Sequence, residues 1–104
     1  MAYIVVFITV SNKKEAVKIA KGLLTAKLVA CVNIVDKVES FFRWEGRVDH
    51  AKEFLLIAKS SRRKFGEIIK MVKSLHSYDV PEIIGLPVIG GNKSYLDWID
   101  DSIR

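Results

Sequence analysis

The sequence contains one cysteine, Cys31, and no hydrophobic run long enough to cross a membrane. A single cysteine cannot form a disulfide within the chain, so nothing in the sequence uses an oxidising compartment. The longest apolar runs, such as residues 3–8, fall far short of the roughly 18 residues that a spanning helix needs, and the first residues lack the charged region of a signal peptide. We therefore expect a cytoplasmic protein with no membrane partner.

Metal ligands and phosphate-binding motifs are also scarce. Besides Cys31 and the carboxylates, the available ligands are His50 and His76, and no two soft ligands stand at chelating spacing. A structural zinc site needs about four ligands, so one chain cannot build it from cysteine and histidine alone, although symmetry could multiply them. No glycine-rich phosphate loop is present. We expect no cofactor that folding requires.

The composition is that of one domain with a substantial core, covering residues 1–104. Half of the residues are hydrophobic, which indicates that some apolar surface is buried against other subunits. The net charge is +5, with a basic run at residues 62–64 followed by Lys70 and Lys73. This pattern suggests nucleic-acid binding, but the same spacing puts the charges on the solvent side of an amphipathic helix. We expect no specific nucleic-acid partner.

Hydrophobic periodicity divides the chain into alternating strands and helices. The predicted strands cover residues 2–10, 28–44, 51–60 and 83–89, and the predicted helices cover residues 12–26, 61–75 and 92–103. The second strand is either unusually long or is two strands joined by a bulge at Asp36. Glu45 and Gly46 mark the turn of a long hairpin, whose far end is expected to project beyond the sheet.

Three helix starts carry capping residues. Asn12 with Glu15 has the spacing of a capping box, in which the Asn12 side chain accepts from free N–H groups and the helix dipole favours the charge of Glu15. Ser60 or Ser61 is expected to cap the second helix and Asn92 the third.

The order of elements predicts an α+β fold, a ferredoxin-like βαββαβ sandwich with an extra C-terminal helix and a long hairpin between its second and third strands. In this topology the first and third strands are central and the other two are edges. Pro87 fits an edge strand, because proline cannot donate to a strand ladder.

Unusual chemistry is concentrated in the loop from His76 to Glu82, which also contains Tyr78 and Asp79. His76 is a candidate ligand for Cu(II) or another divalent cation, although a histidine at a helix end more often caps carbonyl groups. Asp79 and Glu82 could form an acid and base pair, but capping of the loop explains them equally well. We assign no catalytic residue and expect a protein that is not an enzyme.

The hairpin supplies the remaining candidates. Cys31, Asn33, Glu53 and Lys59 lie on the mixed face of its two strands, where buried polar groups need partners. Cys31 is expected to be an inert, buried thiol. We predict a ligand-binding cleft between subunits, lined by these four residues and by Tyr78, Asp79 and Glu82. Phe42 and Trp44 near the hairpin tip are predicted interface residues.

Five segments, in order and along almost the whole chain, resemble the CutA family of divalent-cation-tolerance proteins. They are LVACVNIV (28–35), SFFRWEG (40–46), EFLLIAKS (53–60), HSYDVPEIIGLPV (76–88) and NKSYLDWI (92–99). The resemblance implies a ferredoxin-like protomer that forms a tight homotrimer, similar in shape to PII signalling proteins. It also implies a cytoplasmic protein linked to tolerance of copper and other divalent ions.

The chain departs from the family pattern at a few positions. Ser77 stands where the loop usually has a proline, and Phe42 and Arg43 stand where the family commonly has a tyrosine-rich aromatic pair. Some bacterial members bind copper through a cysteine and two adjacent histidines. Of these positions the chain keeps only His76, with Ile8 and Leu75 at the others. The resemblance therefore implies weak binding of copper.

Three functional hypotheses follow. The first is a trimeric, non-catalytic protein of the divalent-cation-tolerance type that binds divalent metal ions such as copper weakly. The second is a PII-like binder of a small anionic ligand at clefts between subunits, with Lys59 holding the anion. The third is an RNA-binding module of the RRM type, which has the same strand order, but neither central strand matches the RRM signature.

Overall fold

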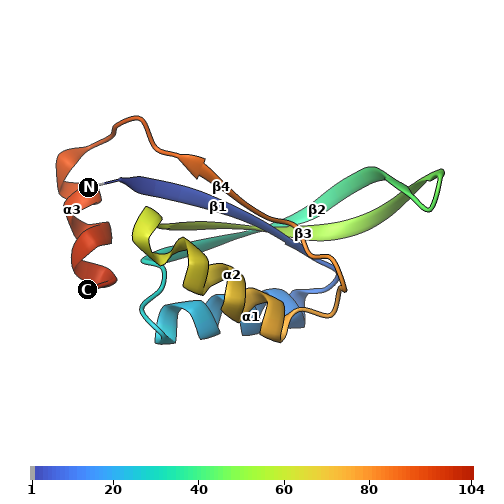
Figure 1. Ribbon diagram of the computed structural model, residues 1–104, viewed down its shortest axis with the longest axis horizontal. Coiled ribbons are helices and arrows are strands. Elements are labelled where there is room, and N and C mark those ends of the chain that lie inside the picture. The colour runs from blue at the N-terminus through green and yellow to red at the C-terminus, as the bar shows by residue number, and fades with distance from the viewer. Residues whose placement is uncertain (1) are drawn as a thin grey trace.

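The computed structural model describes residues 2–104 and shows the predicted order of strands and helices (Figure 1). The elements are β1 (Tyr3–Val10), α1 (Lys13–Thr25), β2 (Cys31–Trp44), β3 (Arg47–Ser61), a short 3-10 helix (Arg62–Lys64), α2 (Phe65–Leu75), β4 (Ile83–Pro87) and α3 (Lys93–Ser102). The four strands form one sheet in the order β2-β3-β1-β4, and every pairing is antiparallel. The ferredoxin-like prediction is confirmed, with β1 and β3 central and an extra C-terminal helix.

Helices α1 and α2 pack side by side on one face of the sheet, and this face contains the core (Figure 1). Each central strand buries alternate side chains against the helices, because successive residues of a strand point to opposite faces. The core includes Ile4, Val6, Ile8 and Val10 of β1, Leu56 and Ala58 of β3, Ala16, Ile19, Ala20 and Leu23 of α1, and Ile68 and Val72 of α2. None of the helices in the described part of the chain is long and apolar enough to cross a membrane.

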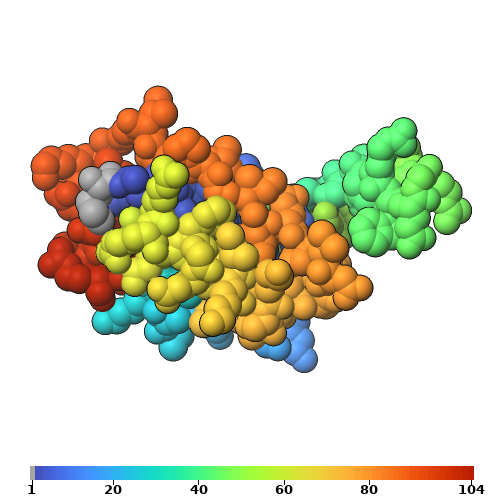
Figure 2. Space-filling view, in the orientation of Figure 1, coloured from blue at the N-terminus to red at the C-terminus, as the bar shows by residue number. Residues whose placement is uncertain are grey.

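The hairpin of β2 and β3 extends well beyond the rest of the sheet (Figures 1 and 2). Its register shifts between Val35 and Val38, and Lys37 has a φ of 62°, so a bulge lies at the position predicted near Asp36. Glu45 and Gly46 both have positive φ, as a two-residue type I′ turn requires. Strand β3 starts at Arg47, four residues before the predicted start, because pairing continues up to this tight turn.

Two local predictions are wrong for reasons visible in the backbone. Strand β2 begins at Cys31 rather than Leu28, because Lys27 turns the chain with a φ of 56° and the Leu28 N–H donates back to the Leu23 carbonyl. Neither Ser60 nor Ser61 caps the second helix. Their hydroxyls instead donate to the Leu28 and Ala2 carbonyls, at 2.6 and 3.2 Å, and fasten neighbouring segments together.

Strand β4 is an edge strand that pairs with β1 alone. The Val88 N–H donates to the Tyr3 carbonyl, and the register pairs Ile4 with Pro87. In an antiparallel ladder hydrogen-bonded pairs alternate with unbonded ones, so the nitrogen of Pro87 faces the free edge. Proline at this position therefore costs no ladder bond, as predicted.

The sheet face opposite α1 and α2 remains largely uncovered. Its apolar side chains include Val35, Ile84 and Leu86, which are 41%, 51% and 39% exposed. Helix α3, capped by the Asn92 side chain as predicted, lies at the end of the sheet farthest from the hairpin tip (Figure 1). The open face and the projecting hairpin together leave much apolar surface in contact with solvent.

Candidate functional site

The loop from His76 to Glu82 connects α2 to β4 and lies near the end of β1. Helix α2 stops at Leu75, and His76 adopts an extended conformation with φ −85° and ψ 143°. The residue before a proline is disfavoured in a helix, so Val80 and Pro81 keep the rest of the loop out of α2. The loop thus brings its polar side chains to the base of the long hairpin.

His76 is the buried centre of this loop, and its side chain is fully inaccessible. Its Nε2 lies 2.7 Å from the Thr9 carbonyl oxygen, which can only accept, so Nε2 carries the proton and donates. Its Nδ1 then accepts from the Tyr78 N–H at 3.0 Å. Both ring nitrogens are engaged in holding the loop against β1. A metal-binding role for His76 remains a prediction, and it requires the ring to leave one of these partners.

Glu15 joins the first helix to the same loop. Its backbone N–H receives the predicted cap from Asn12 at 2.8 Å, but its carboxylate turns away from the cap. One oxygen accepts from the Ser77 N–H at 3.1 Å, and the other lies buried 3.7 Å from His76 Nδ1 without a hydrogen bond. Sequence reasoning assigned Glu15 to the capping box alone and missed this contact.

Tyr78 connects the loop to the hairpin. Its hydroxyl donates to the Glu53 carboxylate at 2.9 Å, and its ring packs on His76 with centroids 4.7 Å apart. Burial, the hydrogen bond to Glu53 and the Glu53 charge raise the pKa of Tyr78 to about 12. Tyr78 therefore remains a neutral hydrogen-bond donor throughout the physiological range.

A cavity of about 830 Å³ lies between this loop and the hairpin. Its lining contains five carboxylates and four aromatic rings, and includes neither lysine nor arginine; the residues are Thr9, Glu39, Ser40, Phe41, Phe42, Trp44, Asp49, Ala51, Glu53, Tyr78, Asp79, Val80 and Glu82. Burial and then the negative charge of Glu53 raise the pKa of Glu82. We call this space the acidic cavity.

Six of the predicted site and interface residues meet in the acidic cavity. They are Phe42, Trp44, Glu53, Tyr78, Asp79 and Glu82. Sequence reasoning missed Glu39, Phe41 and Asp49. Alternation from Glu53 along β3 would have placed Asp49 on the same face, because they are separated by an even number of residues. Glu39 follows the bulge, where simple alternation fails.

The other predicted ligand residues form a separate group near α3. Cys31 and Lys59 are paired across β2 and β3, and the Lys59 ammonium donates to Asn33 and lies 3.9 Å from the Cys31 sulfur. Cys31 is only partly buried, contrary to the prediction, because it begins the edge strand β2. Burial, and next Cys31, raise the pKa of Tyr95 on α3. Glu53 and Lys59 are roughly 20 Å apart along the extended strand. Within one chain the predicted site is therefore two separate groups, one around Glu53 and one around Lys59. A cleft lined by both groups would require a second chain.

The residues of one chain do not form a ready metal centre. Within residues 2–104, no group of three or more histidine, cysteine, aspartate or glutamate side chains is close enough to hold an ion. Carboxylates suit divalent cations chemically, but within residues 2–104 no three of the five in the acidic cavity lie close enough together to hold one ion. Any ion held by this chain alone would have few direct ligands.

Comparison with known proteins gives the family. The CutA1 divalent ion tolerance protein family matches residues 4–102, nearly the whole chain. The chain belongs to this family. The divalent-cation tolerance protein CutA of Archaeoglobus fulgidus is 46% identical over 99 residues, covering 95% of this chain and 96% of the relative. The family takes its name from tolerance of divalent ions and not from a catalysed reaction.

Other relatives agree in fold but differ in length and location. A solved structure titled as the periplasmic CutA of Archaeoglobus fulgidus superposes with a TM-score of 0.95 at 44% identity, covering 98% of this chain and 99% of that one. The chloroplastic CutA 1 of Oryza sativa is 46% identical over 97% of this chain, but the match covers only 57% of the rice protein. The chain thus spans little more than half the length of that relative.

Proposed function

We propose that this chain acts in divalent-cation tolerance as a homotrimer that binds divalent cations, copper among them, weakly in the acidic cavity. The observation that carries the proposal is the charge of that cavity. The chain has 17 lysine and arginine residues and a net charge of +5, yet the cavity is lined by five carboxylates and no basic side chain. A cavity with charges of one sign concentrates ions of the opposite sign.

The energetics favour a cation but not tight binding. Glu53 and Glu82 repel each other, which contributes to the raised pKa of Glu82, and a dication between them would offset this repulsion. Tight sites for hard cations use about six converging oxygen ligands, and Cu(II) sites also favour imidazole. Carboxylates that do not converge, with His76 committed to Thr9 and Tyr78, support a weak site.

Apolar surface supports the trimer. The open face exposes Val35, Ile84 and Leu86, and the hairpin exposes Phe41 and Trp44, which are 70% and 53% accessible. Single chains rarely leave contiguous apolar patches of this kind in water. Copies of the chain are the occupant that we propose, because the projecting hairpin offers each copy an arm that reaches beyond its own sheet (Figure 2). Light scattering at micromolar concentration should give three times the mass of the chain, and a monomer mass would remove this part of the proposal.

Titration with Cu²⁺ and Mn²⁺ by competition at neutral pH tests the cation site. We expect Glu53→Gln and Glu82→Gln to lower the affinity for both ions several-fold, because each substitution removes one negative charge from the cavity. Glu67→Gln is the matched control, since Glu67 lies exposed on α2 outside the cavity. Unchanged affinity in both cavity variants would contradict the proposal.

Two further variants separate the candidate ligands. His76→Ala, with folding checked by circular dichroism, tests the predicted histidine ligand. Weaker copper binding in this variant, with full binding in Glu53→Gln, would assign the ion to the loop histidine and not to the carboxylates. Cys31→Ser should change nothing, because Cys31 lies with Lys59 and Asn33 away from the cavity.

The RNA-binding alternative is supported by only one of the two central strands. An RRM stacks bases on aromatic side chains of both central strands. Tyr3 and Phe7 lie on the open face of β1, but the open face of β3 between Glu53 and Ser61 has no aromatic ring. We expect nucleic acid to bind weakly through phosphate contacts and to dissociate as salt rises from roughly 50 to 200 mM. Sequence-selective binding that persists at the higher salt would revive this alternative.

The cytoplasm remains the proposed location. The relatives do not agree on it, because one is named chloroplastic and one solved structure is titled periplasmic. Cell fractionation with an antibody to the chain would decide the matter.

A further inference from the structure

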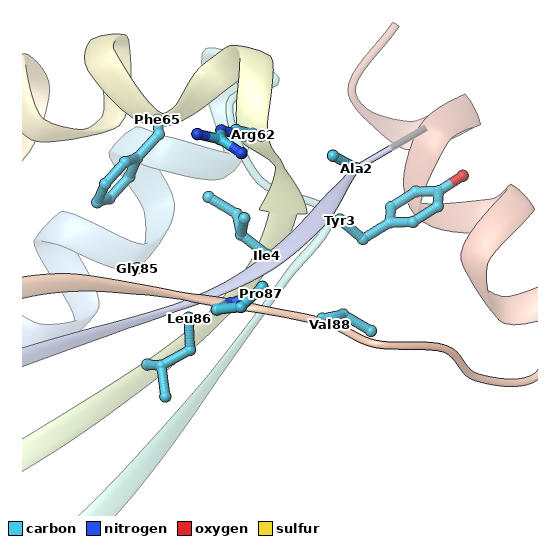
Figure 3. Close-up of a pocket in the computed structure, with 9 residues that line it drawn as sticks. All are labelled: Ala2, Tyr3, Ile4, Arg62, Phe65, Gly85, Leu86, Pro87 and Val88. Atoms are coloured by element: carbon cyan, nitrogen blue, oxygen red, sulfur yellow. The ribbon is translucent and has the colours of Figure 1, made fainter.

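A second cavity, of about 410 Å³, lies where the end of β4 meets the start of α2 (Figure 3). Phe65 and Arg62 stand on the same side of the strands, above Ile4 and Pro87, whereas Leu86 points to the opposite side (Figure 3). The cavity is therefore walled by apolar side chains on the helix-covered side of the sheet, with one guanidinium beside them. We call it the Arg62 cavity.

Gly85 shapes the apolar wall. A Cβ atom at this position would come within 2.8 Å of the Phe65 ring, closer than real side chains approach. Glycine therefore lets the ring lie directly against β4, where it forms one side of the cavity. Ile4, only 7% exposed, forms part of the floor and belongs to the core. The wall is thus built on rigid, packed elements.

The backbone of Arg62 is held by a hydrogen bond, whereas its guanidinium has no ion-pair partner among residues 2–104. Its N–H donates to the Ala2 carbonyl at 2.8 Å, and the Ser61 hydroxyl donates to the same oxygen at 3.2 Å. The neighbouring Arg63 does have such a partner, because its guanidinium lies 3.5 Å from Asp100. A guanidinium presents a planar fork of donors that matches a carboxylate.

We propose that the Arg62 cavity binds a small monocarboxylate with an apolar body, such as an aryl or branched-alkyl acid. The carboxylate pairs with Arg62, and the body lies against Phe65, Ile4 and Pro87. The volume is at the lower end of ligand pockets, which range over roughly 300–1,000 Å³, and so suits a small ligand. Arg62 is the only charged residue that lines the cavity in the described part of the chain, which favours a monoanion over a phosphate dianion.

Amide chemical-shift titration of the full chain with benzoate tests the site, with benzamide as the uncharged analogue. Benzoate should shift the amides of Phe65 and Gly85 and should bind more tightly than benzamide. Arg62→Gln should weaken benzoate roughly tenfold, because it removes a charge-assisted pair. Arg63→Gln, whose guanidinium pairs with Asp100 instead, should leave the affinity unchanged. Gly85→Ala should also weaken binding, because it displaces the Phe65 ring while keeping Arg62.

Three results would overturn the proposal: no shift at Phe65 and Gly85 at millimolar benzoate, equal affinity for benzoate and benzamide, or full affinity in Arg62→Gln. N-acetylphenylalanine distinguishes two sources of the carboxylate. If N-acetylphenylalanine binds more tightly than benzoate, the natural ligand is the carboxyl terminus of a peptide. If it binds more weakly, the natural ligand is a small free acid. Both results support a carboxylate site. Benzoate affinity should not change in Glu53→Gln, so this test is independent of the acidic cavity.

Discussion

The two faces of the sheet carry similar aliphatic side chains but differ in what covers them. On the helix-covered face, Val6 and Ile8 of β1 and Leu56 of β3 are completely inaccessible. On the open face, Val35 and Ile84 are about half exposed, and α1 and α2 lie on the other side of the sheet (Figure 1). Burial of apolar area is the main favourable contribution to folding. The difference teaches that one chain completes only one of its two hydrophobic interfaces, and that assembly is the natural way to complete the other.

Leu56→Ala and Leu55→Ala compare the two faces with the same substitution at adjacent positions of β3. Leu56 is fully buried against the helices, and Leu55 pairs with Val35 and Thr9. We expect Leu56→Ala to lower the free energy of unfolding by about 2–5 kcal/mol, at any protein concentration. Leu55→Ala should instead raise the concentration at which the assembly dissociates. Denaturant titrations at several protein concentrations, with light scattering, measure both effects.

The comparison would fail if both leucine variants lost the same stability without any dependence on protein concentration. That result would mean that the open face is packed within the single chain, or that it contributes nothing to assembly.

Trp44→Ala and Trp98→Ala extend the comparison to the aromatic residues. Trp44 lies 53% exposed near the hairpin tip, whereas Trp98 lies 45% exposed on α3 with its ring 5.4 Å from that of Tyr95. Truncation of a large interface anchor typically costs about 2 kcal/mol or more, so Trp44→Ala should weaken assembly more than Trp98→Ala. Sedimentation and thermal melting measure the effect. If both variants keep the mass and melting of the parent, the hairpin tip is not the anchor.

The fold was predictable because local signals agreed with one another. The strand periodicity, the caps at Asn12 and Asn92 and the turn at Gly46 all lie where the chain uses them. The start of β2 was not predictable, because Leu28 and Val29 are apolar residues of a buried connection and fit a strand pattern equally well. The positive φ of Lys27 could not be predicted either, because lysine is not a residue type that favours this conformation.

The candidate site was predictable only in part, for reasons of distance. The concentration of polar residues in the loop from His76 to Glu82 predicted that Tyr78 and Glu82 belong to a site. That Glu53 and Lys59 lie in two separate groups depends on the length and register of the strands. Glu15 lies in the first turn of α1 and Ser77 follows the C-terminus of α2, so their contact forms only because α1 packs on α2. Composition could not reveal that a chain of net charge +5 has an acidic cavity, because it does not say where charges gather.

The smallest expected effect concerns Tyr78, which links the loop to the hairpin. Its pKa of about 12 lies above the value of about 10 for an unfolded tyrosine, so the folded state holds the proton more tightly. The stabilisation from this proton is therefore fully present below about pH 10 and is lost as the pH rises towards 12. Glu53→Gln removes the carboxylate that accepts the hydroxyl proton and repels the phenolate, so the pKa of Tyr78 should fall towards its ordinary value.

Tyrosinate absorbance during an alkaline titration measures this pKa, and Tyr78→Phe assigns the signal. The titration should be compared with that of Glu82→Gln, since Glu82 does not contribute to the Tyr78 shift. An unchanged late titration in Glu53→Gln would show that the hydrogen bond to Glu53 does not hold the loop on the hairpin. The acidic cavity would then need another contact to keep its two walls together, and the tilted packing of Tyr78 against the buried His76 ring is the candidate to test next.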